Sequence, residues 1–206
     1  MKITKNIGLY FGTFNPIHMG HLIIAHYLAE FSDLDEIWFV ITPHNPHKKK
    51  KALLEDYHRL AMVEMALEEY PKLKASNIEF GLPQPNFTVN TLAFLEEKYS
   101  SYNFSLIMGE DNLKSLHKWK NFEIIVEHYP IYVYPRIAEG NVDERFFKNS
   151  KLIPSIIKVD APIMELSSTF IREAIANNKD IRPMLPKKVW EYIELMNFYK
   201  NKPVLK

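Results

Sequence analysis

The sequence contains no cysteine, which excludes disulfide bonds, thiol catalysis and cysteine-ligated zinc. An excess of either charge is also missing, because 26 lysines and arginines stand against 25 aspartates and glutamates. The resulting net charge of +1 gives no overall electrostatic basis for binding nucleic acid or an anionic membrane. No run approaches the roughly 20 apolar residues of a membrane span, and the first residues lack the apolar stretch of a signal peptide. We therefore expect a cytoplasmic protein without nucleic-acid or membrane partners.

The apolar residues that are present, 47% of 206, suffice for one well-buried domain spanning residues 1–206. Short apolar segments alternate with segments of helical periodicity along the chain. The expected strands are 7–11, 37–41, 104–108, 131–134 and 156–159, and the expected helices are 22–31, 57–70, 89–99, 113–126 and 169–177. Thr88 is the expected N-cap of the third helix. Near-continuous apolar strands are typical of a parallel sheet that is covered on both faces. This order predicts an α/β fold with a Rossmann-like, doubly wound parallel sheet.

The alternation of apolar strands and helical segments ends after Asp180, where Pro183 and Pro186 precede a short amphipathic helix over 189–196. We expect it to belong to a small C-terminal helical extension of about residues 167–206 that packs back on the domain. In doubly wound sheets, ligands bind beyond the carboxyl ends of the strands. Gly12 and Gly109 would both lie there.

Residues 12–22, GTFNPIHMGHL, follow the first expected strand and open a helix. Gly12 has no Cβ and permits close approach to the backbone, while Pro16 delays the helix until after Asn15. His18 and His21 lie three residues apart, so a first helical turn places both imidazoles on one face. A helix N-terminus with two such donors suits a phosphate. Two ordinary histidines at a helix start, or half of a metal site, fit the same spacing.

The pattern Gly-x-Phe-x-Pro-x-His-x-Gly-His resembles the signature of the nucleotidylyltransferase superfamily. Residues 166–172, LSSTFIR, are similar to its other hallmark, a Ser-Ser-Thr-x-Ile-Arg turn that opens a late helix. Two motifs about 150 residues apart in the right order are more specific than either alone. The resemblance implies transfer of a nucleotide monophosphate unit onto a phosphorylated acceptor, with release of pyrophosphate.

Further segments resemble the nicotinate mononucleotide adenylyltransferases in particular. The segments are 46–48 (PHK), 86–92 (NFTVNTL), 108–111 (MGED), Trp119 and 134–136 (YPR). The resemblance covers nearly the whole chain from Ile7 to the C-terminal helix. It implies ATP and nicotinate mononucleotide as substrates, in NAD biosynthesis.

The same resemblance implies a set of site residues. The expected ATP-binding residues are Gly12, Thr13, Phe14, His18, His21, Gly109, Asp111, Ser168, Thr169 and Arg172. The expected nicotinate mononucleotide-binding residues are Lys48, Thr88, Trp119 and Arg136. We expect His18, His21, Lys48 and Arg172 to act in catalysis, with Mg²⁺ arriving on the ATP phosphates and no metal cage from the protein. Trp119 would offer a flat indole face to the pyridinium ring.

Two residues depart from the family pattern. Phe11 replaces the first of two glycines, and Asn15 replaces an aspartate. Asparagine keeps the capacity to accept a hydrogen bond but loses the charge. If the aspartate only shapes the turn, asparagine can replace it.

Several alternatives stay open. Within the superfamily the acceptor could be nicotinamide mononucleotide, phosphopantetheine or a phosphorylated alcohol, although threonine usually stands at the His18 position in the phosphopantetheine enzymes. Two His-x-x-His pairs, His18 with His21 and His44 with His47, could instead form a zinc site. Residues 48–51, four lysines, could bind RNA, although a solvated loop fits equally well. Association into a homo-oligomer is not decided by the sequence.

Overall fold

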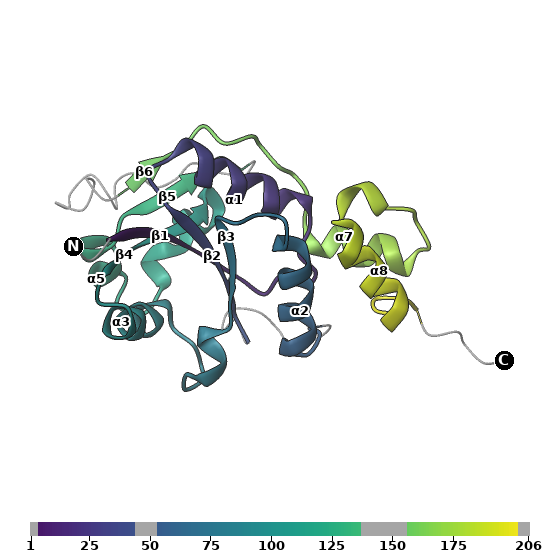
Figure 1. Ribbon diagram of the computed structural model, residues 1–206, viewed down its shortest axis with the longest axis horizontal. Coiled ribbons are helices and arrows are strands. Elements are labelled where there is room, and N and C mark those ends of the chain that lie inside the picture. The colour runs from purple at the N-terminus through teal and green to yellow at the C-terminus, as the bar shows by residue number, and fades with distance from the viewer. Residues whose placement is uncertain (1–3, 44–52, 137–155, 202–206) are drawn as a thin grey trace.

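The computed structural model describes residues 4–43, 53–136 and 156–201. Within these ranges the chain forms a six-stranded sheet in the order β3-β2-β1-β4-β5-β6 (Figure 1). The strands are β1 Lys5–Gly12, β2 Glu36–Ile41, β3 Leu73–Ser76, β4 Tyr102–Gly109, β5 Ile131–Tyr134 and β6 Ile156–Lys158. Every neighbouring pair is parallel. This is the doubly wound order, in which the direction of winding reverses between β1 and β4, and it confirms the predicted fold class.

Helices cover both faces of the sheet (Figure 1). The α-helices are α1 Met19–Phe31, α2 Asp56–Leu67, α3 Thr88–Lys98, α4 Glu110–Ser115, α5 Phe122–His128, α7 Ser168–Ala176 and α8 Lys187–Met196. Short 3₁₀ turns lie at η1 Ile78–Gly81, η2 Leu116–Lys118 and η4 Arg182–Met184. No helix in the described ranges is long and apolar enough to cross a bilayer.

Alternation along the strands divides the core between the two faces. In β5, Ile131 and Val133 pack on the side of α3 and α5, whereas Tyr132 and Tyr134 pack on the side of α1 and α2. Both sets are buried, as the near-continuous apolar sequence predicts. The side of α1 and α2 also receives Ile171 of α7 and Ile193 of α8, so the C-terminal helices share this core.

Three details differ from the sequence-based expectation. The edge strand β3 was not expected, because its sequence LKAS lacks an apolar run. The single helix expected over 113–126 is divided into α4, η2 and α5, since Trp119 is extended and Asn121 adopts a left-handed conformation with φ 51°. Thr88 is the first residue of α3 rather than its N-cap, which is Phe87, and no side chain caps this end.

Candidate active site

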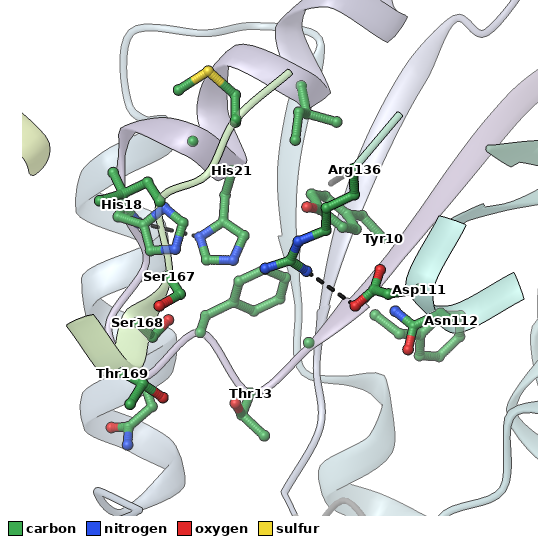
Figure 2. A pocket seen from close by; sticks show the side chains of 18 of the residues that line it. Tyr10, Thr13, His18, His21, Asp111, Asn112, Arg136, Ser167, Ser168 and Thr169 are labelled. Carbon is green, nitrogen blue, oxygen red and sulfur yellow. Dashed lines mark hydrogen bonds and ion pairs between the residues drawn. The ribbon is translucent and has the colours of Figure 1, made fainter. Parts of the chain in front are cut away.

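A cavity of about 460 Å³ lies where the winding of the sheet reverses. Its walls come from the ends of β1 and β4, the N-terminus of α1, and the N-terminus of α7 (Figure 2). It brings together most of the residues expected to bind ATP, namely Gly12, Thr13, Phe14, His18, His21, Asp111, Ser168, Thr169 and Arg172. Gly109, the remaining residue of that set, does not line the cavity but precedes α4 as its N-cap.

The two histidines stack on one another at the start of α1. Their ring centroids are 3.7 Å apart and the ring planes differ by 24°. His18 is the N-cap, and its backbone N–H donates to Nδ1 of His21 at 3.3 Å. Because Nδ1 of His21 accepts this hydrogen bond, the neutral His21 ring carries its proton on Nε2 and can donate from there.

His18 is buried, with only 3% of its surface exposed. Burial, and then the positive charge of Arg136, lower the pKa of His18 from 6.5 to about 4. Within the described part of the chain its Nδ1 has no hydrogen-bond partner. At neutral pH the free protein therefore holds His18 as an uncharged imidazole.

Two glycines of this turn make room for neighbouring side chains. A Cβ on Gly12 would lie 2.8 Å from the ring of Phe14, so Gly12 makes room for that ring, and its backbone still lines the cavity. A Cβ on Gly20 would lie 3.1 Å from Nδ1 of His18. Gly20 thus makes room for the buried imidazole. Phe14 itself has a positive φ of 44°, which is unusual for an aromatic residue.

The second motif docks directly on the first. Ser168 Oγ donates to the carbonyl of Pro16 at 2.9 Å, and Arg172 Nη1 donates to the carbonyl of Asn15 at 2.8 Å. Ser167 caps α7, because its Oγ accepts the N–H of Phe170 at 3.2 Å. These contacts place the N-termini of α1 and α7 at one cavity, although the motifs are far apart in sequence.

The opposite wall carries an ion pair. Arg136 Nη1 lies 3.2 Å from Asp111 Oδ2, and in Figure 2 the guanidinium reaches from Asp111 towards His21. A Cβ on Gly109 would meet Asp111 Oδ1 at 2.5 Å and the ring of Tyr134 at 3.1 Å, so this position has no room for a side chain. The structure places Arg136 in this cavity, apart from Thr88 and Trp119, with which the sequence grouped it.

A second cavity of about 110 Å³ adjoins the first. Phe11, Gly12, Thr13 and Asn112 line both cavities. Thr88 and the half-buried Trp119 line the second one. Lys48, His44 and His47 fall outside the described residues.

Comparison with known proteins agrees with this architecture. Residues 9–174 match the family model described as cytidylyltransferase-like. A protein of Flavobacterium psychrophilum is 64% identical over 95% of this chain and 99% of its own length, and one of Christiangramia forsetii is 62% identical over 96% and 100%. Both are named as probable nicotinate-nucleotide adenylyltransferases. The chain belongs to the nicotinate-nucleotide adenylyltransferase family.

The fold of this adenylyltransferase family is also found in solved structures. The nicotinic acid mononucleotide adenylyltransferase of Plasmodium falciparum, complexed with NaAD, superimposes with a TM-score of 0.77 at 22% identity, over 95% of this chain and 97% of that chain. A putative nicotinate-nucleotide adenylyltransferase of Vibrio parahaemolyticus gives a TM-score of 0.70 at 20% identity, over 96% and 97%. At these identities the likeness concerns the fold.

The alternative of a zinc site gains no support from the described residues. In those ranges, no group of three or more histidine, aspartate or glutamate side chains is arranged to hold a metal ion. His21 Nδ1 already accepts a backbone hydrogen bond, and the His18 and His21 rings are stacked.

Three residues that were not predicted from the sequence support the adenylyltransferase site. Arg59 of α2 is completely buried, and its guanidinium donates to four backbone carbonyls and pairs with a carboxylate. Its partners are the carbonyls of Thr13, Thr42, Pro43 and Leu54 and the side chain of Asp56. The signal was available, because Arg59 shares a helical face with Met62, Val63 and Ala66, all buried.

The other two are Glu79 and Tyr199. Glu79 is buried beside the second cavity and accepts a hydrogen bond from Thr91 Oγ1 at 2.7 Å. Burial raises the pKa of Glu79. Tyr199, which follows α8, donates from its hydroxyl to Asn15 Oδ1 at 2.8 Å. Neither residue lies in a recognisable motif, so no sequence signal marks them.

Proposed function

We propose that this chain transfers AMP from ATP to nicotinate mononucleotide, giving nicotinate adenine dinucleotide and pyrophosphate. The observation that carries the proposal is the convergence of two helix N-termini, each opened by a family motif, on one cavity at the reversal point of the sheet. Relatives named as probable nicotinate-nucleotide adenylyltransferases align over nearly the full length of the chain, and they support the choice of acceptor.

In the proposed reaction a phosphate oxygen of nicotinate mononucleotide attacks the α-phosphorus of ATP in line. The bond from that phosphorus to the bridging oxygen of the β-phosphate breaks, and pyrophosphate leaves with the electron pair. The second pKa of a phosphate monoester is about 6, so the attacking group is mostly dianionic at pH 7 and needs no general base. Catalysis then depends on positioning and on stabilising charge that builds up in the transition state.

The described residues supply donors suited to that task. We assign His18 to the α-phosphate and His21, through Nε2–H, to the neighbouring ATP phosphates. Arg172 lies in the second turn of α7. Its guanidinium would meet the β- and γ-phosphates together with the backbone N–H groups at the start of that helix. ATP would enter as its Mg²⁺ complex, with the ion held mainly by phosphates and water, and Asp111 is the carboxylate that lines the cavity.

The second cavity suits the pyridine ring of the acceptor. It adjoins the first cavity, and the half-buried Trp119 gives an aromatic face within it. A pyridinium ring stacked there would bring the rest of the mononucleotide towards the ends of β1 and β4. Lys48 stays a predicted phosphate ligand, since it lies outside the described residues.

The deciding experiment measures pyrophosphate release by the purified protein with Mg-ATP. Nicotinate mononucleotide, nicotinamide mononucleotide and phosphopantetheine are compared at equal concentration, with a His18→Ala variant as the control for contaminating activity. We expect the highest kcat/KM with the nicotinate form. The absence of pyrophosphate release with both mononucleotides would refute the proposed function, and preference for phosphopantetheine would reassign the acceptor.

A further inference from the structure

The segment that follows α8 turns back towards the phosphate-binding end of β1. Asn197 has φ 53° and Tyr199 has φ 63°, two left-handed conformations within three residues. The N–H of Phe198 donates to the carbonyl of Ile193 at 3.1 Å, which closes the end of α8. A left-handed tyrosine is strained and persists only where its surroundings hold it.

That contact is with Asn15 in the turn between β1 and α1. Tyr199 Oη donates to Asn15 Oδ1 at 2.8 Å, and the N–H of Leu54 donates to the same oxygen at 3.4 Å. Asn15 is only 4% exposed, so this hydrogen bond is shielded from water. Burial raises the pKa of Tyr199, and the hydroxyl therefore keeps its proton as a donor.

The backbone of the same asparagine holds a cation of the cavity. The carbonyl of Asn15 accepts from Arg172 Nη1 at 2.8 Å, while the adjacent Phe14 has its positive φ of 44°. On the other side of Phe14, the carbonyl of Thr13 accepts from Arg59 Nη1 at 2.7 Å. The strained turn is thus fixed at both flanking residues, by Arg59 at one and by Tyr199 at the other.

We propose that Tyr199 is a positioning residue for the ATP phosphates, acting through the amide of Asn15 on the turn and on Arg172. The segment after α8 packs on the core, and through Tyr199 it also positions the guanidinium of Arg172 in the cavity. Tyr199 does not line that cavity and does not touch the reacting atoms. The inference rests on the proposed function, in that the cavity binds ATP.

The test is Tyr199→Phe, which removes the hydroxyl and keeps the ring. Tyr192→Phe is the matched control, because Tyr192 Oη also makes a side-chain hydrogen bond from the C-terminal region, to His58 Nδ1 at 2.8 Å. We expect Tyr199→Phe to lower kcat/KM for ATP by about threefold to tenfold, the range for one buried hydrogen bond. Tyr192→Phe should stay within about twofold of the wild type. Equal kinetic losses in both variants, or wild-type kinetics in Tyr199→Phe, would overturn the proposal.

A double-variant cycle separates positioning from a general loss of stability. Asn15→Leu removes the acceptor at similar volume, so adding Tyr199→Phe to it should cost no further activity. Asn15→Asp keeps the acceptor, and adding Tyr199→Phe to it should again cost about threefold or more. Additive losses in the Asn15→Leu background would refute the coupling. If Asn15→Leu does not fold, the Asn15→Asp pair decides alone, and the absence of an added loss there refutes the coupling.

ATP binding without an acceptor distinguishes this inference from the proposed function. The rise in melting temperature caused by Mg-ATP should be smaller in Tyr199→Phe than in the wild type and in Tyr192→Phe. This readout does not depend on which acceptor the enzyme uses. Inactivity of the wild type with nicotinate mononucleotide would refute the proposed function, and an undiminished ATP-induced shift in Tyr199→Phe would refute the positioning role.

Discussion

The buried imidazole of His18 predicts a specific dependence of stability on pH. In the folded protein the pKa of His18 is lowered from 6.5 to about 4, first by burial and then by Arg136. The unfolded chain therefore binds more protons than the folded one between these two values. Stability rises with pH wherever this holds, so the contribution of His18 is complete above pH 6.5 and is lost as the pH falls towards 4.

The size of the effect follows from the shift. A change of one pKa unit corresponds to 1.36 kcal/mol, so lowering the pKa of His18 from 6.5 to about 4 amounts to about 3 kcal/mol. His18→Gln removes the titrating group. Relative to this variant, the wild type should lose about 3 kcal/mol of unfolding free energy between pH 6.5 and pH 4.

Urea unfolding followed by tryptophan fluorescence measures this difference, since the chain has three tryptophans. His26→Gln, at an exposed position of the same helix, is the control for losing a histidine from α1. Arg136→Met should reduce the pH-dependent loss, because it removes the second cause of the lowered pKa. A difference between the wild type and His18→Gln that stays constant from pH 7.5 to pH 4 would refute a neutral, buried His18.

Three further predictions concern the cavity. His18→Ala should lower kcat on the order of 10²-fold while changing ATP affinity much less, because the charge facing His18 grows in the transition state. Steady-state kinetics with ATP titrations measure both effects, and a loss of affinity with unchanged kcat would contradict the prediction. Arg172→Lys should lower kcat/KM for ATP by about tenfold or more, since an ammonium group cannot replace a planar guanidinium that binds phosphate and also donates to the carbonyl of Asn15. Wild-type kinetics would remove Arg172 from the site. Gly109→Ala should destabilise the protein by about 1–3 kcal/mol in urea unfolding. The new Cβ would lie 2.5 Å from Asp111 Oδ1 and would push that carboxylate away from Arg136. Unchanged stability would show that the carboxylate moves freely.

The sequence predicted those parts of the fold in which local patterns and tertiary structure agree. Parallel strands that are buried on both faces contain near-continuous apolar runs, so β1, β2, β4 and β5 were identifiable. The strand β3 was not, because an edge strand with lysine and serine has no such pattern. The break at Trp119 was missed for a related reason: the helical periodicity on either side continues, and only tertiary packing extends the chain there.

The site was predictable as far as its motifs reach. The two motifs correctly indicated which donors meet at the cavity, since the N-termini of α1 and α7 do come together. Sequence could not show that Arg136 pairs with Asp111 in that cavity, nor that Gly12 and Gly20 make room for Phe14 and a buried imidazole. Such facts depend on distances between segments that are remote in sequence. The buried supports Arg59 and Tyr199 belong to the same class.

The positive charge of the cavity depends on whether an anion is bound beside His18. Arg136 is paired with Asp111, and His18 is neutral in the free protein because burial and Arg136 together oppose its protonation. An anion bound beside His18 would oppose both effects, since a phosphate favours the protonated imidazole. The cavity would then gain positive charge as the triphosphate arrives, and more in the transition state, where the charge on the reacting phosphate oxygens is greatest. A permanently charged residue in place of His18 would bind ATP and the transition state more equally, which raises affinity without raising kcat. We therefore interpret the burial of His18 as a way of reserving its charge for the bound and reacting states.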